Sequence, residues 1–174
     1  MHTSVKSISP GERLQAVDLI QFIDASPSPW HAVHSIEQRL LAQGFSELQE
    51  SERWKLQAGG QYYVVRGGAS IIAFKLGQKP LTETGFRMIG AHTDSPGLRL
   101  KTHAAHKSDG LVRLGVEIYG GPILATFTDR DLSLAGRVNI RTANGFDTRL
   151  IKFEQPLVRL PNLAIHMNRE VNEQ

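Results

Sequence analysis

The chain has 174 residues, with 20 lysine and arginine side chains against 17 aspartate and glutamate, seven histidines and no cysteine. An apolar fraction of 40% and a charged fraction of 21% are typical of a folded domain and exclude a disordered or fibrous chain. The net charge of +3 is spread evenly, without the basic patch of a nucleic-acid binder. Without cysteine, any metal must be held by histidine, aspartate or glutamate.

Neither a membrane segment nor a secretion signal is predicted. No stretch approaches the roughly 18 consecutive apolar residues that a membrane helix needs. The first 25 residues lack the apolar core of a signal peptide. We therefore expect a cytoplasmic protein that does not bind membranes.

Two helices are predicted at the start of the chain. Residues 9–12, Ser-Pro-Gly-Glu, form a capping box with proline at the first helical position. Residues 26–29, Ser-Pro-Ser-Pro, end this helix and begin a second one, which Gly44 ends. The apolar faces consist of Leu14, Val17, Ile20 and Ile23 on the first helix and Val33, Ile36, Leu40 and Leu41 on the second.

After residue 53 the pattern becomes that of strands. Residues 61–66 and 69–76 are rich in β-formers, and Gly67-Gly68 between them predicts a hairpin turn. Residues 87–92 are a short apolar run that predicts a third strand. A half-buried strand is predicted around Leu98 and Leu100. The polar residues 102–110 are expected to form a linker or a crossover between domains.

The rest of the chain is predicted to be mostly β-structure. Residues 111–119 alternate between polar and apolar, as in a strand. Asn144-Gly145 predicts a hairpin between residues 137–142 and 148–153. Two short strands are expected at residues 156–160 and 163–166.

The most informative chemistry lies at His92 and Asp94. Residues two apart in an extended chain point to the same side, so both side chains would project together from a strand end. Imidazole is the commonest metal ligand, and a nearby carboxylate can orient it. The alternative is a surface histidine before a turn-forming aspartate, because His-x-Asp alone is a weak motif.

Other candidates have structural explanations. His166 follows an apolar run and could be an ordinary strand-end histidine. His103 and His106 lie in the polar segment expected to be a linker. The charges at residues 129–131, Asp-Arg-Asp, suggest a structural ion-pair cluster.

Longer motifs are more specific than His-x-Asp. Residues 88–96, Met-Ile-Gly-Ala-His-Thr-Asp-Ser-Pro, with Leu-Arg-Leu-Lys at 98–101, resemble the signature of the M18 metallo-aminopeptidases, the aspartyl aminopeptidase family. Thr102 is a small departure, since proline is usual there. Further blocks similar to this family follow the same order along the chain, at residues 22–33, 119–121, 129–137 and 160–169.

The resemblance implies an α/β fold with a zinc-peptidase-like catalytic domain, of which residues 1–102 are the N-terminal part. Residues 103–174 would be the first part of a β-rich dimerisation domain. The implied activity removes N-terminal, often acidic, residues from peptides, using two divalent metals, usually zinc, with manganese or cobalt also possible. His92 would be a metal ligand, Asp94 would support the metal site, and His166 would be lent to the partner subunit's active site. The implied assembly is a homo-oligomer built from dimers, a dodecamer.

Members of this family are much longer than the chain. The resemblance therefore implies an N-terminal portion that lacks the remaining metal ligands and the general base. We expect such a chain to be inactive alone and poorly stable as a monomer, because an open sheet edge would remain. One alternative is a non-catalytic truncated paralogue that acts as an assembly module. Another is an enzyme of different chemistry built on His92, His103 and His106.

Overall fold

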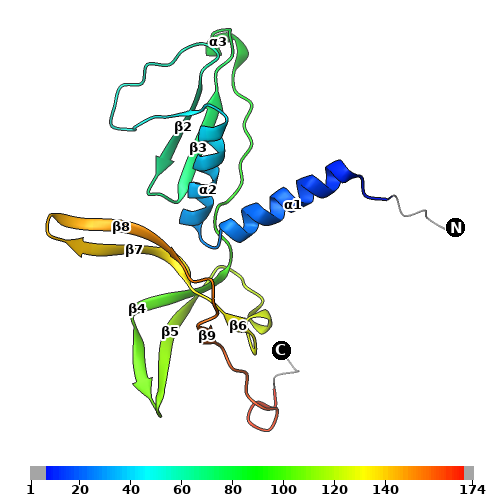
Figure 1. Ribbon diagram of the computed structural model, residues 1–174, viewed down its shortest axis with the longest axis vertical. Helices are drawn as coiled ribbons and strands as arrows, with labels where there is room; N and C mark the ends of the chain where they lie inside the picture. The colour runs from blue at the N-terminus through cyan, green and yellow to red at the C-terminus, as the bar shows by residue number, and fades with distance from the viewer. Residues whose placement is uncertain (1–6, 171–174) are drawn as a thin grey trace. The chain divides into compact units, whose positions relative to one another are not determined.

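The chain folds into short helices and mainly antiparallel strands (Figure 1). The structure is a computed structural model that describes residues 7–170. The elements in chain order are α1 (Pro10–Ala25), α2 (Pro29–Ala42), β1 (Ser46–Glu47), β2 (Gln61–Arg66), β3 (Ser70–Lys75), α3 (Leu81–Thr84), β4 (Gly97–Ser108), β5 (Leu111–Tyr119), the 3-10 helix η1 (Leu124–Thr126), β6 (Asp131–Leu132), β7 (Ala135–Thr142), β8 (Gly145–Lys152) and β9 (Val158–Arg159).

Both N-terminal helices begin where the sequence predicts. At α1, the Ser9 hydroxyl accepts the Glu12 N–H at 3.2 Å, and Glu12 Oε2 accepts the Ser9 N–H at 2.7 Å. This reciprocal pair satisfies two backbone donors that a helix start leaves open. At α2, the Ser28 hydroxyl accepts the backbone N–H of His31 at 3.4 Å. In the part of the chain described, no helix is long and apolar enough to cross a membrane.

The first sheet contains three strands in the order β1-β2-β3. The predicted β2–β3 hairpin is confirmed, and residues 67–69 form its turn because Arg66 pairs with Ser70. Gly67 and Gly68 have φ angles of +61° and +69°, which glycine adopts without steric cost. The parallel strand β1 was not predicted, since two residues carry no detectable pattern.

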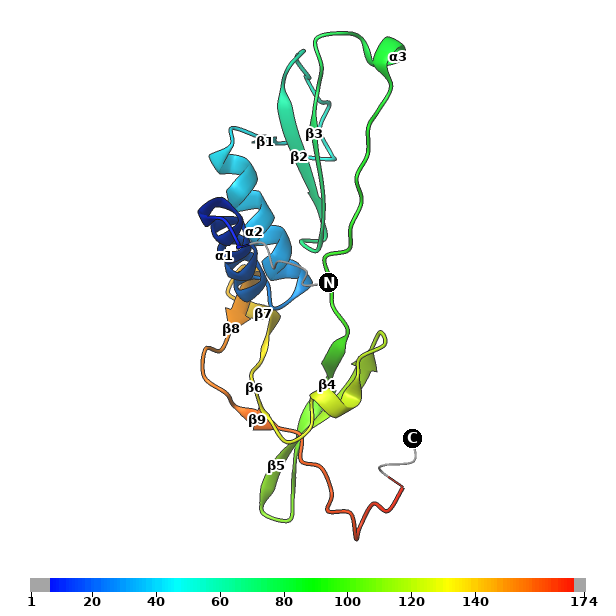
Figure 2. The same ribbon diagram turned by 90° about the vertical axis from the view of Figure 1, so that its right-hand side faces the viewer.

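The core of this region is the contact between α2 and the sheet (Figures 1 and 2). Ala32 and Val33 of α2 and Tyr63 and Val64 of β2 are the buried apolar residues among those described. Of the predicted apolar face of α2, Val33 is buried, Ile36 and Leu40 are half-buried, and Leu41 is exposed. On α1, the predicted apolar residues Leu14, Val17, Ile20 and Ile23 are all exposed.

Helix α1 is held to α2 by Arg39. Its guanidinium donates to both carboxylate oxygens of Asp18, at 2.8 and 2.9 Å, and lies 5.2 Å from the centre of the Phe22 ring. The hydrogen bond from Arg39 lowers the pKa of the Asp18 carboxyl from its usual value. The two helices are therefore joined by a charged contact on their exposed surfaces.

Three predictions of secondary structure are wrong. Residues 87–92 are not a strand; Met88 and Ile89 are fully or almost fully exposed, and no strand within residues 7–170 pairs with them. Residues 102–110 are not a linker, because residues 102–108 continue β4 and residues 105–108 of these pair with β5. Residues 163–166 are not a strand and lead into a turn. Each error has the same origin: strand formation depends on a hydrogen-bonding partner, which the polarity of a segment does not reveal.

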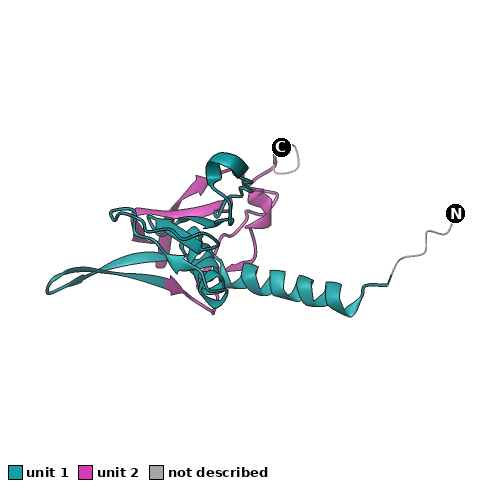
Figure 3. Ribbon diagram, turned by 90° about the horizontal axis from the view of Figure 1, so that it is seen from above, with its two compact units in different colours: residues 1–94, 136–150 teal, residues 95–135, 151–174 magenta. Residues whose placement is uncertain are grey.

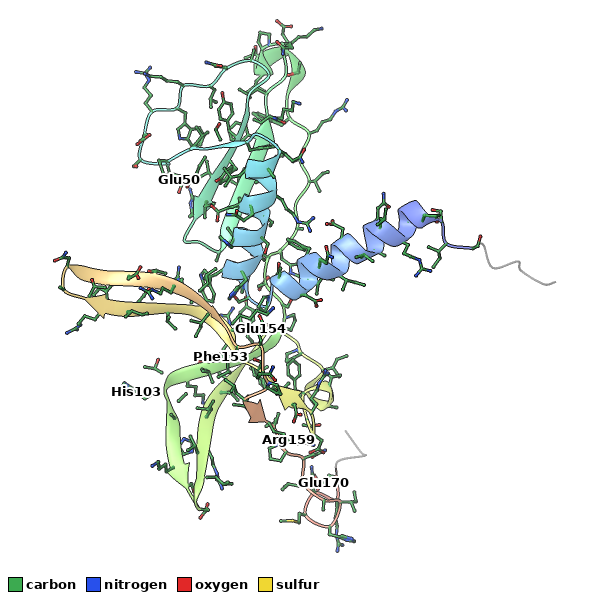
Figure 4. All side chains as sticks on the ribbon, in the orientation of Figure 1. Glu50, His103, Phe153, Glu154, Arg159 and Glu170 are labelled. Atoms are coloured by element: carbon green, nitrogen blue, oxygen red, sulfur yellow. The ribbon has the colours of Figure 1, made fainter. Side chains whose placement is uncertain are left out.

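The β4–β5 hairpin contains a bulge. Leu100 pairs with Val116 and Ala105 pairs with Leu114, so residues 101–104 face a single residue of β5. His103, labelled in Figure 4, lies in this bulge with a φ of +55°. The later hairpin, β7–β8, is formed as Asn144-Gly145 predicts, with Gly145 as the first residue of β8.

Contacts between residues divide the chain into two units, shown in Figure 3. The first unit contains residues 1–94 and 136–150, and the second contains residues 95–135 and 151–174. The two ends that belong to these ranges, residues 1–6 and 171–174, lie outside the described residues. In the second unit the β4–β5 hairpin is accompanied by the short β6–β9 pair, in which Asp131 pairs with Arg159.

We predict that the substitution Val33→Ala destabilises the first unit by about 2 kcal/mol, because it removes two methyl groups from a position that is 1% exposed. The matched control is Val17→Ala in α1, where the side chain is 44% exposed and the expected change is below about 0.5 kcal/mol. Urea unfolding followed by circular dichroism measures both. Equal losses of stability in Val33→Ala and Val17→Ala would contradict the assignment of Val33 to the core.

We also predict that the contact between α1 and α2 weakens in acid. The pKa of Asp18 is lower in the folded chain than its usual 3.8, so its contribution is present above 3.8 and is lost as the pH falls through the lowered value. Thermal melting of the wild type and of Asp18→Asn should therefore differ at about pH 6 and converge at about pH 2. A difference that persists in acid would show that the charge of Asp18 is not responsible.

Candidate functional site

His92 and Asp94 lie together in the segment between α3 and β4. His92 Nδ1 is 2.7 Å from the backbone carbonyl oxygen of Asp94 and 3.3 Å from its carboxylate Oδ1. The His92 side chain is 80% exposed and that of Asp94 is 36% exposed. The predicted pairing of these side chains is thus present, although a bend at Thr93, rather than a strand end, produces it.

This geometry determines which nitrogen of His92 carries the proton when the ring is neutral. A carbonyl oxygen can only accept a hydrogen bond, so Nδ1 must donate to it. Nε2 then carries a lone pair and can bind a metal ion. A histidine ligand whose other nitrogen donates to a carbonyl or carboxylate is a common arrangement around zinc. The residues therefore fit one corner of a zinc site.

Sequence reasoning missed a contact that fixes this segment. The hydroxyl of Thr93 donates to the backbone carbonyl of Ala69 in the β2–β3 turn, at 2.8 Å. Thr93 is half-buried, although its neighbour His92 is exposed. Sequence spacing cannot reveal this bond, because the two residues are 24 positions apart.

Within residues 7–170, no group of three or more histidine, aspartate or glutamate side chains is placed to hold a metal. The alternative of a complete site built on His92, His103 and His106 therefore has no structural support in this region. His103 and His106 both belong to β4, where His106 Nδ1 lies 3.3 Å from the carbonyl oxygen of Ala104.

His166 belongs to the second unit and is exposed. It lies in a turn in which the carbonyl of Ala164 accepts the backbone N–H groups of Met167 at 2.8 Å and Asn168 at 3.2 Å. His92 and Asp94 belong to the first unit. The structure thus brings His92 and Asp94 together and places His166 on a separate segment.

Asp129 anchors the segment that leads to His166. Its N–H donates to Leu160 at 2.9 Å, its carboxylate accepts the Asn162 N–H at 3.1 Å, and its carbonyl accepts from Arg159 at 2.9 Å. Arg159, labelled in Figure 4, also pairs with Asp131 at 3.4 Å. The charges at residues 129–131 are thus structural, as expected. Asp131 forms an ion pair, whereas the carboxylate of Asp129 and the guanidinium of Arg130 bind backbone groups.

Comparison with known proteins supports the motifs. Residues 22–174 match the family described as Aminopeptidase I zinc metalloprotease (M18). A protein from Ectopseudomonas mendocina, named "Probable M18 family aminopeptidase 2", is 53% identical over 154 residues, which are 88% of this chain and 36% of that protein. The chain therefore spans about a third of the length of the curated relatives it matches.

Solved structures share the fold. The structure described as the Ape4 and Nbr1 complex matches with a TM-score of 0.87 and 39% identity, over 97% of this chain and 33% of that one. The S. cerevisiae mApe1 dodecamer matches with a TM-score of 0.79 and 30% identity, over 87% and 36%. The mixed α/β fold is thus the one expected from the sequence. Since the family match covers most of the residues and agrees with the order of the motifs, the chain belongs to the M18 family of aminopeptidases and is an N-terminal portion of that fold.

Proposed function

We propose that this chain contributes to a metal-dependent aminopeptidase that removes N-terminal residues, in particular acidic ones, from peptides. The observation that carries the proposal is the hydrogen bond between His92 Nδ1 and the Asp94 carbonyl, which leaves Nε2 available to a metal. His92 occupies the position of a metal ligand in the motif at residues 88–96. Zinc fits this nitrogen donor and the family description.

The residues of the chain would act in distinct ways. His92 would bind one metal through Nε2, and Asp94 would hold the imidazole in the required orientation. When bound, two divalent metals would supply Lewis acidity and lower the pKa of a water molecule. His166 would donate a hydrogen bond to the negative charge that develops on the substrate carbonyl oxygen, in the active site of the partner subunit.

The proposed organisation follows the same family. Residues 1–102 would belong to the catalytic domain and residues 103–174 to a dimerisation domain. A homo-oligomer is supported by the similarity to the S. cerevisiae mApe1 structure, which is described as a dodecamer. A cytoplasmic location completes the proposal, with peptides as substrates.

We predict that the 174-residue chain alone does not hydrolyse an aspartyl or glutamyl anilide. Its described residues offer no group of three metal-ligating side chains, whereas a catalytic zinc needs about three protein ligands. The control is a chimera that continues this chain with the remaining part of the Ectopseudomonas mendocina relative. Zinc-dependent turnover is expected from the chimera and none from the chain.

Either of two results would contradict this prediction. Steady, metal-dependent turnover by the chain alone, abolished in His92→Ala, would show that its site is complete. A folded chimera that binds zinc without turnover would favour the alternative, a non-catalytic assembly module.

We predict different defects for His92→Ala and His166→Ala in the chimera. Loss of a metal ligand should remove zinc, whereas loss of a hydrogen-bond donor to the transition state should lower kcat by about 10²–10³ and leave zinc bound. Metal analysis and steady-state kinetics separate the two.

Mixing the two inactive variants tests whether the site is shared. If each site needs its own His92 and the His166 of the partner subunit, mixed dimers regain up to one working site. No recovery after verified subunit exchange would show that His166 acts within its own subunit or only structurally.

A further inference from the structure

Two contacts from distant parts of the chain converge on the β2–β3 turn, residues 67–69. The hydroxyl of Thr93 donates to the carbonyl of Ala69 at 2.8 Å. Arg137 of β7 donates from Nη1 to the carbonyl of Gly67, also at 2.8 Å. Both contacts lie within the first unit, although Arg137 is 70 positions beyond Gly67.

Arg137 is also held in place by an aromatic ring. Its guanidinium carbon lies 4.9 Å from the centre of the Trp30 ring, at the start of α2. A β-carbon added at Gly68 would lie 3.5 Å from Trp30 and 3.6 Å from Arg137. The turn therefore packs directly against both side chains, and Arg137 connects it to α2 and to the β7–β8 hairpin.

Thr93 is the point at which the candidate site is attached to this turn. The hydrogen bond from His92 Nδ1 to the Asp94 carbonyl closes a loop with Thr93 at its centre. The residues that precede this loop are exposed, with Met88 and Ile89 at 89% and 102%. The bond from Thr93 to Ala69 thus ties residues 92–94 to the sheet.

We propose that Thr93 is a positioning residue for His92 and that Arg137 acts on the same site through the β2–β3 turn. Thr93 holds the bend in which the Asp94 carbonyl selects the Nδ1–H form of His92. Arg137 fixes the turn that accepts the Thr93 hydroxyl. This inference rests on the proposed function, because the tautomer of His92 matters only if Nε2 binds a metal. The geometry itself can be tested without measuring turnover.

The first experiment compares Thr93→Val, which keeps the shape but removes the O–H donor, with Thr93→Ser, which keeps the donor. Nitrogen-15 NMR of the His92 ring in the 174-residue chain, at a fixed pH where the ring is neutral, reports which nitrogen carries the proton. We expect Nδ1–H in the wild type and in Thr93→Ser. In Thr93→Val the signals should move towards those of a peptide of residues 88–97. Unchanged signals in a folded Thr93→Val variant would overturn the proposal.

The second experiment tests the contribution of Arg137 and does not depend on the folding of Thr93→Val. Arg137→Met keeps much of the side-chain length but removes the donor to Gly67. Arg141→Met is the matched control, because Arg141 lies on the same strand and stacks on Phe146 at 5.8 Å. We expect Arg137→Met to shift the His92 ring signals and Arg141→Met to leave them unchanged. Equal shifts of the His92 ring signals in Arg137→Met and Arg141→Met would overturn the proposed role of the β2–β3 turn.

Combining the variants tests whether they act by one route. If both residues act through residues 67–69, Arg137→Met should add little to the shift caused by Thr93→Val. Full additivity would show independent effects and overturn the coupling.

Adding Zn²⁺ to the chimera, rather than to the chain alone, separates this inference from the proposed function, because the described residues of the chain offer no group of three metal-ligating side chains. A shift of the His92 Nε2 signal in the unsubstituted chimera, weakened in Thr93→Val, supports both. The tautomer difference without any response to Zn²⁺ would support the positioning role and overturn the proposed metal ligand.

Discussion

The packing of α2 on the β2–β3 sheet is the contact on which the first unit depends. Val33 and Tyr63 are its most deeply buried side chains, at 1% and 2% exposure. Burial raises the pKa of the Tyr63 hydroxyl, and the carboxylates of Glu47 and Glu37 add to this effect. Because this core is small, the polar contacts at the end of the sheet have an important part in fixing the segment that carries His92.

The sequence correctly predicts those features that depend only on residues close together in the chain. The capping box at Ser9, the second helix start at Ser28 and the hairpin at Gly67-Gly68 all depend on residues a few positions apart. In contrast, the polar half of β4 does not look like a strand in the sequence, because its strand conformation comes from pairing with β5. The strand predicted at residues 87–92 is absent for the converse reason. These residues have strand-forming side chains but no partner strand among residues 7–170.

The sequence predicts the chemical groups of the candidate site, but not the contacts that hold them in place. The spacing of His92 and Asp94 correctly predicted that their side chains meet, although a bend and a backbone carbonyl produce the contact. The contact of Thr93 and the backbone partners of Asp129 cannot be predicted from the sequence, because the groups bound are backbone atoms 24 and 31 to 33 positions away. Every residue carries a backbone carbonyl group, so a sequence pattern cannot identify which carbonyl accepts a hydrogen bond from a distant side chain.

The left-handed glycines of the β2–β3 turn have a consequence for how this region can vary in evolution. At either Gly67 or Gly68, any replacement introduces a β-carbon at a positive φ, a conformation that costs an ordinary residue about 1–2 kcal/mol. The hydrogen bonds from Arg137 to Gly67 and from Thr93 to Ala69 are accepted by backbone carbonyls, which are present whatever the side chain. Mutational drift is therefore restricted by backbone shape at the two glycines, while the hydrogen bonds that meet at the turn place no demand on the side chain of Ala69.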